Sequence, residues 1–162
     1  MSQKQNGPND TIVACATPPG KGAISVVRLS GQKAIPITDA MLKNAKDRQS
    51  HRLYRAKLLD AQGQLLDDAM IVEMKGPHSY SGEDIVELHV HGAPYIVESV
   101  IERSLELGAR HAEPGEFSLR AFTHGKLGLD QAEAVADLIA ACSQKEVRAA
   151  TRILGGELCK QV

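Results

Sequence analysis

The sequence is poor in aromatic residues and carries no excess of either charge. Aromatic side chains make up 3% of the 162 residues and tryptophan is absent, so we expect the core to be aliphatic. Lys and Arg number 19 against 20 Asp and Glu. Proteins that bind nucleic acid through its phosphates usually have a clear basic excess. We therefore expect the chain to hold RNA weakly, unless its charges segregate onto one face.

Cysteines are few and long apolar runs are absent. Cys15, Cys142 and Cys159 are an odd number of thiols that lie far apart, a pattern that predicts neither a disulfide framework nor a zinc site. Reduced thiols are typical of cytosolic proteins. The first residues are polar, unlike a signal peptide, and no run approaches the roughly 20 apolar residues that span a bilayer. We expect a cytoplasmic or organelle-internal protein, not a secreted one, and no membrane segment; the cytoplasm is our prediction.

The apolar pattern predicts an α+β domain followed by helices. Residues 1–10 are predicted to form a disordered leader. Strands are expected at 11–17, 23–29, 53–59, 69–74 and 85–91. One helix is expected after Gly31 to about residue 43, and another over 93–107. Turn residues at 60–63 favour a hairpin between the third and fourth strands.

Beyond residue 115 the pattern is wholly helical. Asp130 with Glu133, and Ser143 with Glu146, have the spacing of a capping box, so two helices are expected to begin there. These helices have too little apolar surface to form a core alone. Because no cap is evident before Val162, we expect the chain to be the first part of a longer protein.

The strand at 85–91 alternates strictly, which places Glu87, His89 and His91 on one face. Imidazole and carboxylate groups are common metal ligands. A complete site needs further ligands that the sequence does not provide, so we expect no metal and interpret this face as the polar lining of a crevice.

Phosphate-binding and nucleophilic motifs are missing. The Gly-Lys pairs at 20–21 and 125–126 lack the remainder of a P-loop, and Leu127 stands where a magnesium-binding hydroxyl is required. No serine or cysteine lies in a nucleophile signature. The chain alone is therefore not expected to hydrolyse GTP.

Three segments carry a specific resemblance to a known family: TPPGKGAISVVRLSG (17–31), GPHSYSGEDIVELHVHGAP (76–94) and EPGEFSLRAFTHGKLGLDQAEAVADLI (113–139). At these residues the sequence resembles the MnmE/TrmE family, bacterial and organellar GTPases that modify the wobble uridine of certain tRNAs. The resemblance covers nearly all of the chain after the leader. Small departures occur at Gly128, Asp130 and Ala93, the last in place of a more usual glycine.

The resemblance implies a domain organisation. Residues 11–125 would form an N-terminal domain of the tetrahydrofolate-binding type, with a mixed β-sheet and flanking helices, which dimerises. Residues 126–162 would begin a helical domain, and the GTPase domain and a C-terminal cysteine motif would be absent. The full-length protein would use GTP, K⁺ and Mg²⁺. It would act on C5 of the tRNA wobble uridine with a flavin-dependent partner of the MnmG/GidA family.

The resemblance also implies a site for 5-formyl-tetrahydrofolate or a related folate at Arg28, Glu87 and Lys126. A pterin presents an N–H beside an amino group, and one carboxylate can accept from both, which suits Glu87. Arg28 and Lys126 are cationic donors suited to the carboxylates and ring carbonyl of a folate.

Two other functions remain open from the sequence. One is a folate-dependent aminomethyltransferase, although such an enzyme requires a longer chain with its own substrate domain. The other is a non-catalytic dimerisation module whose pocket no longer binds a ligand. A folate-binding assay separates the second from the main interpretation.

Overall fold

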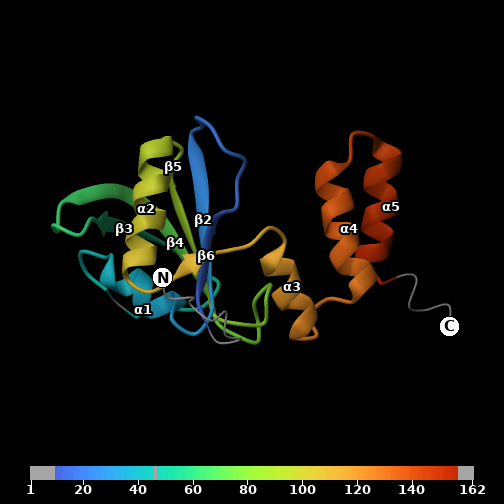
Figure 1. The fold of residues 1–162 in the computed structure, drawn as a ribbon, viewed down its shortest axis with the longest axis horizontal. Helices are drawn as coiled ribbons and strands as arrows, with labels where there is room; N and C mark the ends of the chain where they lie inside the picture. The colour runs from blue at the N-terminus through green and yellow to red at the C-terminus, as the bar shows by residue number, and fades with distance from the viewer. Residues whose placement is uncertain (1–9, 46, 157–162) are drawn as a thin grey trace, which may run out of the picture. The chain divides into compact units, whose positions relative to one another are not determined.

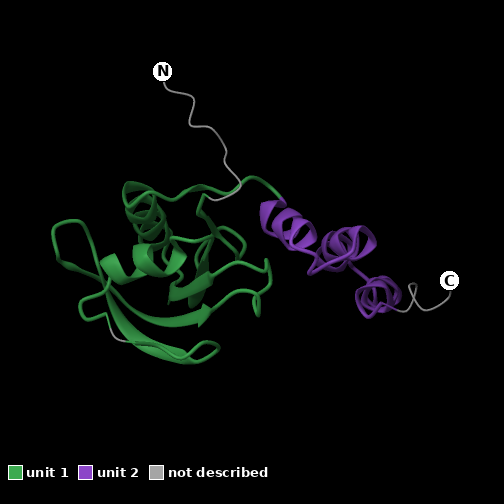
Figure 2. Ribbon diagram, turned by 90° about the horizontal axis from the view of Figure 1, so that it is seen from below, with its two compact units in different colours: residues 1–114 green, residues 115–162 purple. Residues whose placement is uncertain are grey.

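The computed structural model describes residues 10–45 and 47–156, in two compact units. Unit 1 is Met1–Pro114 and unit 2 is Gly115–Val162, coloured green and purple in Figure 2. Residues 1–9 of the expected leader, and Cys159, lie outside the described residues. The family domain boundary expected after residue 125 stays a prediction.

Unit 1 is built on a six-stranded sheet with the order β3-β4-β5-β2-β1-β6. Its strands are β1 (Ile12–Cys15), β2 (Ile24–Ser30), β3 (Leu53–Leu59), β4 (Leu65–Met74), β5 (Ile85–His91) and β6 (Arg110–His111). β6 runs parallel to β1, whereas the other neighbouring strands are antiparallel. The expected α+β class with a mixed sheet is confirmed.

One face of this sheet carries the core. Alternate residues of β5, namely Val86, Leu88 and Val90, are buried beneath the helices α1 (Ala34–Ala40) and α2 (Pro94–Glu106). Figure 1 shows both helices on the same side of the strands. Because neighbouring side chains on a strand point to opposite faces, Glu87, His89 and His91 lie on the other side of the sheet, as the alternation predicted.

Two features of unit 1 differ from the expectation. β4 begins at Leu65 rather than at residue 69, and it pairs with β3 back to Leu59. β6 was not expected, because two residues are too few to show an alternating pattern. β6 forms by parallel pairing with β1, and Ile12 lies opposite Arg110 in this pairing.

In its described part, residues 115–156, unit 2 contains three helices, α3 (Glu116–Thr123), α4 (Leu129–Ala140) and α5 (Gln144–Leu154). The capping box expected at Asp130 and Glu133 is wrong. α4 begins one residue earlier than Asp130, and the N–H of its N-cap, Gly128, donates to Gln131 Oε1 at 2.8 Å. Any Cβ at Gly128 would meet Asp130 Oδ1 at 2.6 Å, so a glycine suits this cap.

The second capping box is confirmed at α5. Ser143 Oγ accepts from the N–H of Glu146 at 3.3 Å, and Glu146 Oε2 accepts from the N–H of Ser143 at 3.0 Å. A further hydrogen bond from the N–H of Cys142, with those from Ser143, holds the pKa of Glu146 below its usual value. The connection between α4 and α5 is therefore fixed by side chains at the start of α5.

We predict that Ser143→Ala destabilises the first turn of α5. Loss of an N-cap hydroxyl costs about 1 kcal/mol, which corresponds to roughly fivefold faster amide exchange. NMR-detected hydrogen exchange of Val147 and its neighbours measures this. Lys145→Ala, on the exposed side of the same turn, is the control and should leave the rates nearly unchanged; equal acceleration in both variants would contradict the role of the cap.

Candidate functional site

Arg28 contacts Glu87 on the open face of the sheet, by which we mean the face opposite the helices α1 and α2. These residues lie directly opposite each other on the antiparallel strands β2 and β5, and opposed side chains of neighbouring strands share a face. Arg28 Nε donates to Glu87 Oε1 at 2.9 Å, and Arg28 Nη2 lies 2.7 Å from the same oxygen. Both side chains are partly exposed, at 26% and 17%. Two of the three predicted site residues are thus brought together.

Tyr80 supports the arginine from a second direction. The guanidinium carbon of Arg28 lies 5.7 Å from the centre of the Tyr80 ring, within the range of a cation–π contact. Tyr80 belongs to the loop between β4 and β5, whose Ser81 hydroxyl lies 2.7 Å from that of Ser30 on β2. Tyr80 was not predicted as a site residue. Its signal was a rare aromatic residue inside a segment that carries the family resemblance.

The two oxygens of the Glu87 carboxylate have different neighbours. Both contacts with Arg28 use Oε1, while Oε2 lies 3.5 Å from His89 Nε2. A carboxylate offers about four acceptor positions over its two oxygens. His89 Nε2 is enclosed and has no hydrogen-bond partner within the described residues. A donor group that approaches Glu87 would therefore meet Oε2 beside an imidazole nitrogen.

The three polar residues of β5 turn to different partners. His91 Nδ1 lies 2.7 Å from Asp67 Oδ1, and the backbone N–H of His91 donates to Asp67 Oδ2 at 2.9 Å. Glu87 instead contacts Arg28. Across residues 10–45 and 47–156 no group of three or more His, Cys, Asp and Glu side chains is placed to hold a metal ion.

Lys126 belongs to unit 2, two residues before the N-cap of α4. Its backbone N–H donates to Ala121 O at 2.8 Å, which closes the chain onto the end of α3. The turn passes through Gly125, whose φ of +68° is unfavourable for other residues. The meeting of Lys126 with Arg28 and Glu87 stays a prediction.

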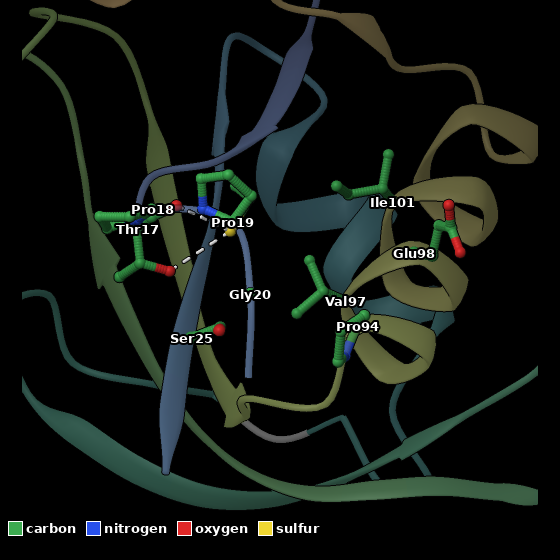
Figure 3. Close-up of a pocket in the computed structure, with 10 residues that line it drawn as sticks. Thr17, Pro18, Pro19, Gly20, Ser25, Pro94, Val97, Glu98 and Ile101 are labelled. Atoms are coloured by element: carbon green, nitrogen blue, oxygen red, sulfur yellow. Dashed lines mark hydrogen bonds between the residues drawn. The ribbon is translucent and has the colours of Figure 1, made fainter. Parts of the chain in front are cut away.

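A separate apolar pocket of about 340 Å³ lies on the helix-covered side of the sheet, between the loop that follows β1 and one flank of α2. Figure 3 shows Val97 and Ile101 of α2 turned toward Pro19. At its wall, Cys15 Sγ lies 3.3 Å from Thr17 Oγ1. The pocket contains neither Arg28 nor Glu87. Recognition of a polar heterocycle requires placed donors and acceptors, so the charged pair is the better candidate.

Comparison with known proteins identifies the family. A family model described as the GTP-binding protein TrmE N-terminus matches residues 11–126. The chain belongs to this family. The match confirms the resemblance seen in the sequence, and the TrmE N-terminal region it covers contains Arg28, Glu87 and Lys126.

Similar curated proteins carry the name tRNA modification GTPase MnmE. The protein of Hydrogenovibrio crunogenus is 48% identical over 155 residues, which cover 95% of this chain and 34% of the relative. Those of a Synechococcus strain and of Pseudomonas aeruginosa are 47% and 44% identical over 92% and 94% of the chain. The chain spans about a third of the length of these relatives. Of the helices described, none is long and apolar enough to cross a membrane.

Proposed function

We propose that this chain binds a formyl-tetrahydrofolate-type one-carbon carrier and dimerises, as the N-terminal part of a tRNA-modification GTPase. The Arg28–Glu87 pair is the observation that carries the folate assignment. A pterin edge offers N–H donors next to a ring carbonyl, and the pair offers a carboxylate acceptor next to a guanidinium donor. Charge-assisted hydrogen bonds of this kind are among the stronger ones in proteins.

Lys126 would complete the site. A folate ends in carboxylates, which a lysine ammonium can bind as a point charge. Such a site has one half that recognises the heterocycle, at Arg28 and Glu87, and another that recognises the acidic tail. The one-carbon group supplied by the bound folate would be the source of the carbon added to the tRNA base.

The open sheet face also supports dimer formation. Ile24 of β2, a strand separated from β3 by β4 and β5, lies on the same face as Arg28 by register and is 64% exposed. Neither α1 nor α2 covers this face, because both pack on the core side. A large apolar side chain that is exposed on an uncovered sheet face can be buried against another molecule, with a gain of roughly 1.5–3 kcal/mol when burial is complete. A second copy of the chain is the occupant we propose.

In the full-length protein, GTP, K⁺ and Mg²⁺ would bind outside this chain, because the sequence lacks a phosphate loop. The longer relatives are named as tRNA modification GTPases. We infer that the intact protein acts on the wobble uridine with a flavin-dependent protein of the MnmG/GidA family, and that this chain contributes the carrier site.

We predict that the wild-type chain binds 5-formyl-tetrahydrofolate and that Lys126→Ala weakens this binding about tenfold or more. A hydrogen bond to a charged group contributes roughly 1.5–3 kcal/mol, and 1.4 kcal/mol is a tenfold change in affinity. Isothermal titration calorimetry of both proteins measures the change. Lys145→Ala is the matched control, since it removes an equal charge from the exposed side of α5.

Three outcomes are informative. No binding by the wild-type chain would overturn the folate assignment and favour a module that only dimerises. Binding that Lys126→Ala and Lys145→Ala affect equally would remove Lys126 from the site. Binding that only Lys126→Ala weakens supports the site as proposed.

A further inference from the structure

Positive charge is concentrated in one short segment of this nearly neutral chain. Residues 43–57 contain six of the 19 Lys and Arg residues but only one of the 20 acids, Asp47. The remainder of the chain is consequently acidic. The overall balance near zero therefore conceals a local excess, which is the condition under which an otherwise neutral protein can bind a polyanion.

These cations differ in burial and in their contacts. The side chain of Arg48 is buried and forms ion pairs with Glu73 and Asp39. Four others, Lys43, Arg52, Arg55 and Lys57, are exposed. We call these four residues the basic edge. Lys46 lies outside the described residues.

The basic edge follows the outer strand of the sheet. β3 is the terminal strand in the order β3-β4-β5-β2-β1-β6, so its outer side faces away from the core. Arg55 and Lys57 are two residues apart on β3 and share one face. The N–H of Lys43 donates to Lys57 O at 3.0 Å, which fixes the chain around Lys43 beside Lys57. Residues from two segments are thus combined into one surface.

A shallow hollow of about 480 Å³ lies along this surface, lined by Lys43, Asn44, Arg55, Ala56, Lys57 and Asp68. Its single acid is already neutralised, because Arg55 Nε donates to Asp68 Oδ1 at 2.9 Å and Arg55 Nη2 to Oδ2 at 2.6 Å. These hydrogen bonds hold the pKa of Asp68 below its usual value. Within the described residues Lys43 and Lys57 make no ion pair, so their charges remain available to a ligand.

We propose that the basic edge binds the phosphate backbone of tRNA. This inference rests on the proposed role in tRNA modification, and it gives the chain a contact with the substrate that is separate from the folate site. Lysine and arginine side chains on an exposed strand provide the sequence-independent electrostatic contact that phosphates favour. A membrane surface would require an apolar face to insert beside the charges, whereas the hollow offers ammonium, guanidinium and amide groups.

The test compares two double charge reversals in the 162-residue chain. Fluorescence anisotropy with labelled tRNA is measured from 25 to about 200 mM salt, a range in which phosphate contacts dominate the salt dependence. Lys43→Glu with Lys57→Glu should weaken binding at least tenfold at the lowest salt. It should also reduce the slope of log K against log salt by about 1.5, since each phosphate contact contributes about 0.7–0.9.

Lys145→Glu with Arg148→Glu is the matched control. Both residues are exposed on α5, and the change in net charge is the same. This variant should keep the wild-type slope and lose less than threefold in affinity. Equal losses in the two variants, or no tRNA binding by the wild-type chain, would overturn the proposal.

Two further measurements separate this inference from its alternatives. Binding of wild-type chain to phosphatidylserine-containing vesicles but not to tRNA would overturn it in favour of a lipid surface. The basic-edge variant should retain wild-type affinity for 5-formyl-tetrahydrofolate, which shows that it is folded. Conversely, tRNA binding that depends on the basic edge, in a chain that binds no folate, would refute the carrier site and leave the basic edge in place.

Discussion

In the Glu87→Ala variant we expect 5-formyl-tetrahydrofolate to bind at least 100-fold more weakly than in the wild-type chain. The substitution removes the acceptor for the pterin donors and also releases Arg28, whose Nε and Nη2 both contact Glu87 Oε1. Loss of the two charge-assisted hydrogen bonds expected between the pterin donors and Glu87 corresponds to roughly 3–6 kcal/mol of binding free energy. A 100-fold loss of affinity corresponds to about 2.7 kcal/mol, so it is a lower bound. Isothermal titration calorimetry measures the affinity.

Glu98→Ala is the matched control for this experiment. It removes the same charge from α2, beside the apolar pocket on the other side of the sheet, and should leave the affinity unchanged. Sedimentation should show the same dimer in both variants, because the Glu87 carboxylate contacts Arg28 of the same chain. If Glu98→Ala weakened binding and Glu87→Ala did not, the folate would belong in the apolar pocket.

The second large effect concerns stability. We expect Glu73→Ala to lower the free energy of unfolding by about 3 kcal/mol. Glu73 is 3% exposed and Arg48 6%, and Arg48 Nε donates to Glu73 Oε1 at 2.6 Å. Loss of one partner from a buried ion pair costs roughly 3–5 kcal/mol. Asp39, which is more exposed, still contacts Arg48, so the lower end of that range applies. Urea denaturation measures the change.

Two variants test the cause of this loss. Asp68→Ala removes an acid from the exposed Arg55–Asp68 pair and should move the urea midpoint much less, because exposed ion pairs contribute little. Arg48→Met combined with Glu73→Leu should recover most of the stability, since apolar residues of similar size can replace a buried pair. A double variant as unstable as Glu73→Ala would show that packing, rather than an unpaired charge, is responsible.

Periodic segments were predicted well from the sequence, and features set by distant partners were not. The alternation of β5 identified which side chains leave the core. The contact between Arg28 and Glu87, 59 positions apart, follows only from the β2–β5 register, which the alternation does not determine. The family resemblance grouped the two residues without this geometry. β6 and the start of β4 were missed or misplaced because pairing with a neighbouring strand, rather than local pattern, forms them.

The turn between β5 and α2 requires a glycine at position 92, whereas position 93 tolerates an alanine in place of the glycine usual in the family. A Cβ at Gly92 would approach Gly22 O to 2.5 Å, because the N–H of Gly22 donates to Gly92 O at 2.9 Å. Ala93, by contrast, is exposed and extended at the N-cap of α2, where a methyl group is tolerated. The departure from the family pattern at Ala93 therefore leaves the turn intact.

The position of Arg55 and Lys57 at a sheet margin also affects how the protein behaves at high concentration. An outer strand presents unpaired backbone groups that can recruit a strand from another molecule, and charged side chains oppose this. Part of the outer side of β3 is already occupied, since the N–H of Leu59 donates to Met41 O. Along the rest, an incoming β3 would bring a second set of cations against the first. At the opposite margin β6 has only two residues, so the sheet offers little for fibrous growth at either end.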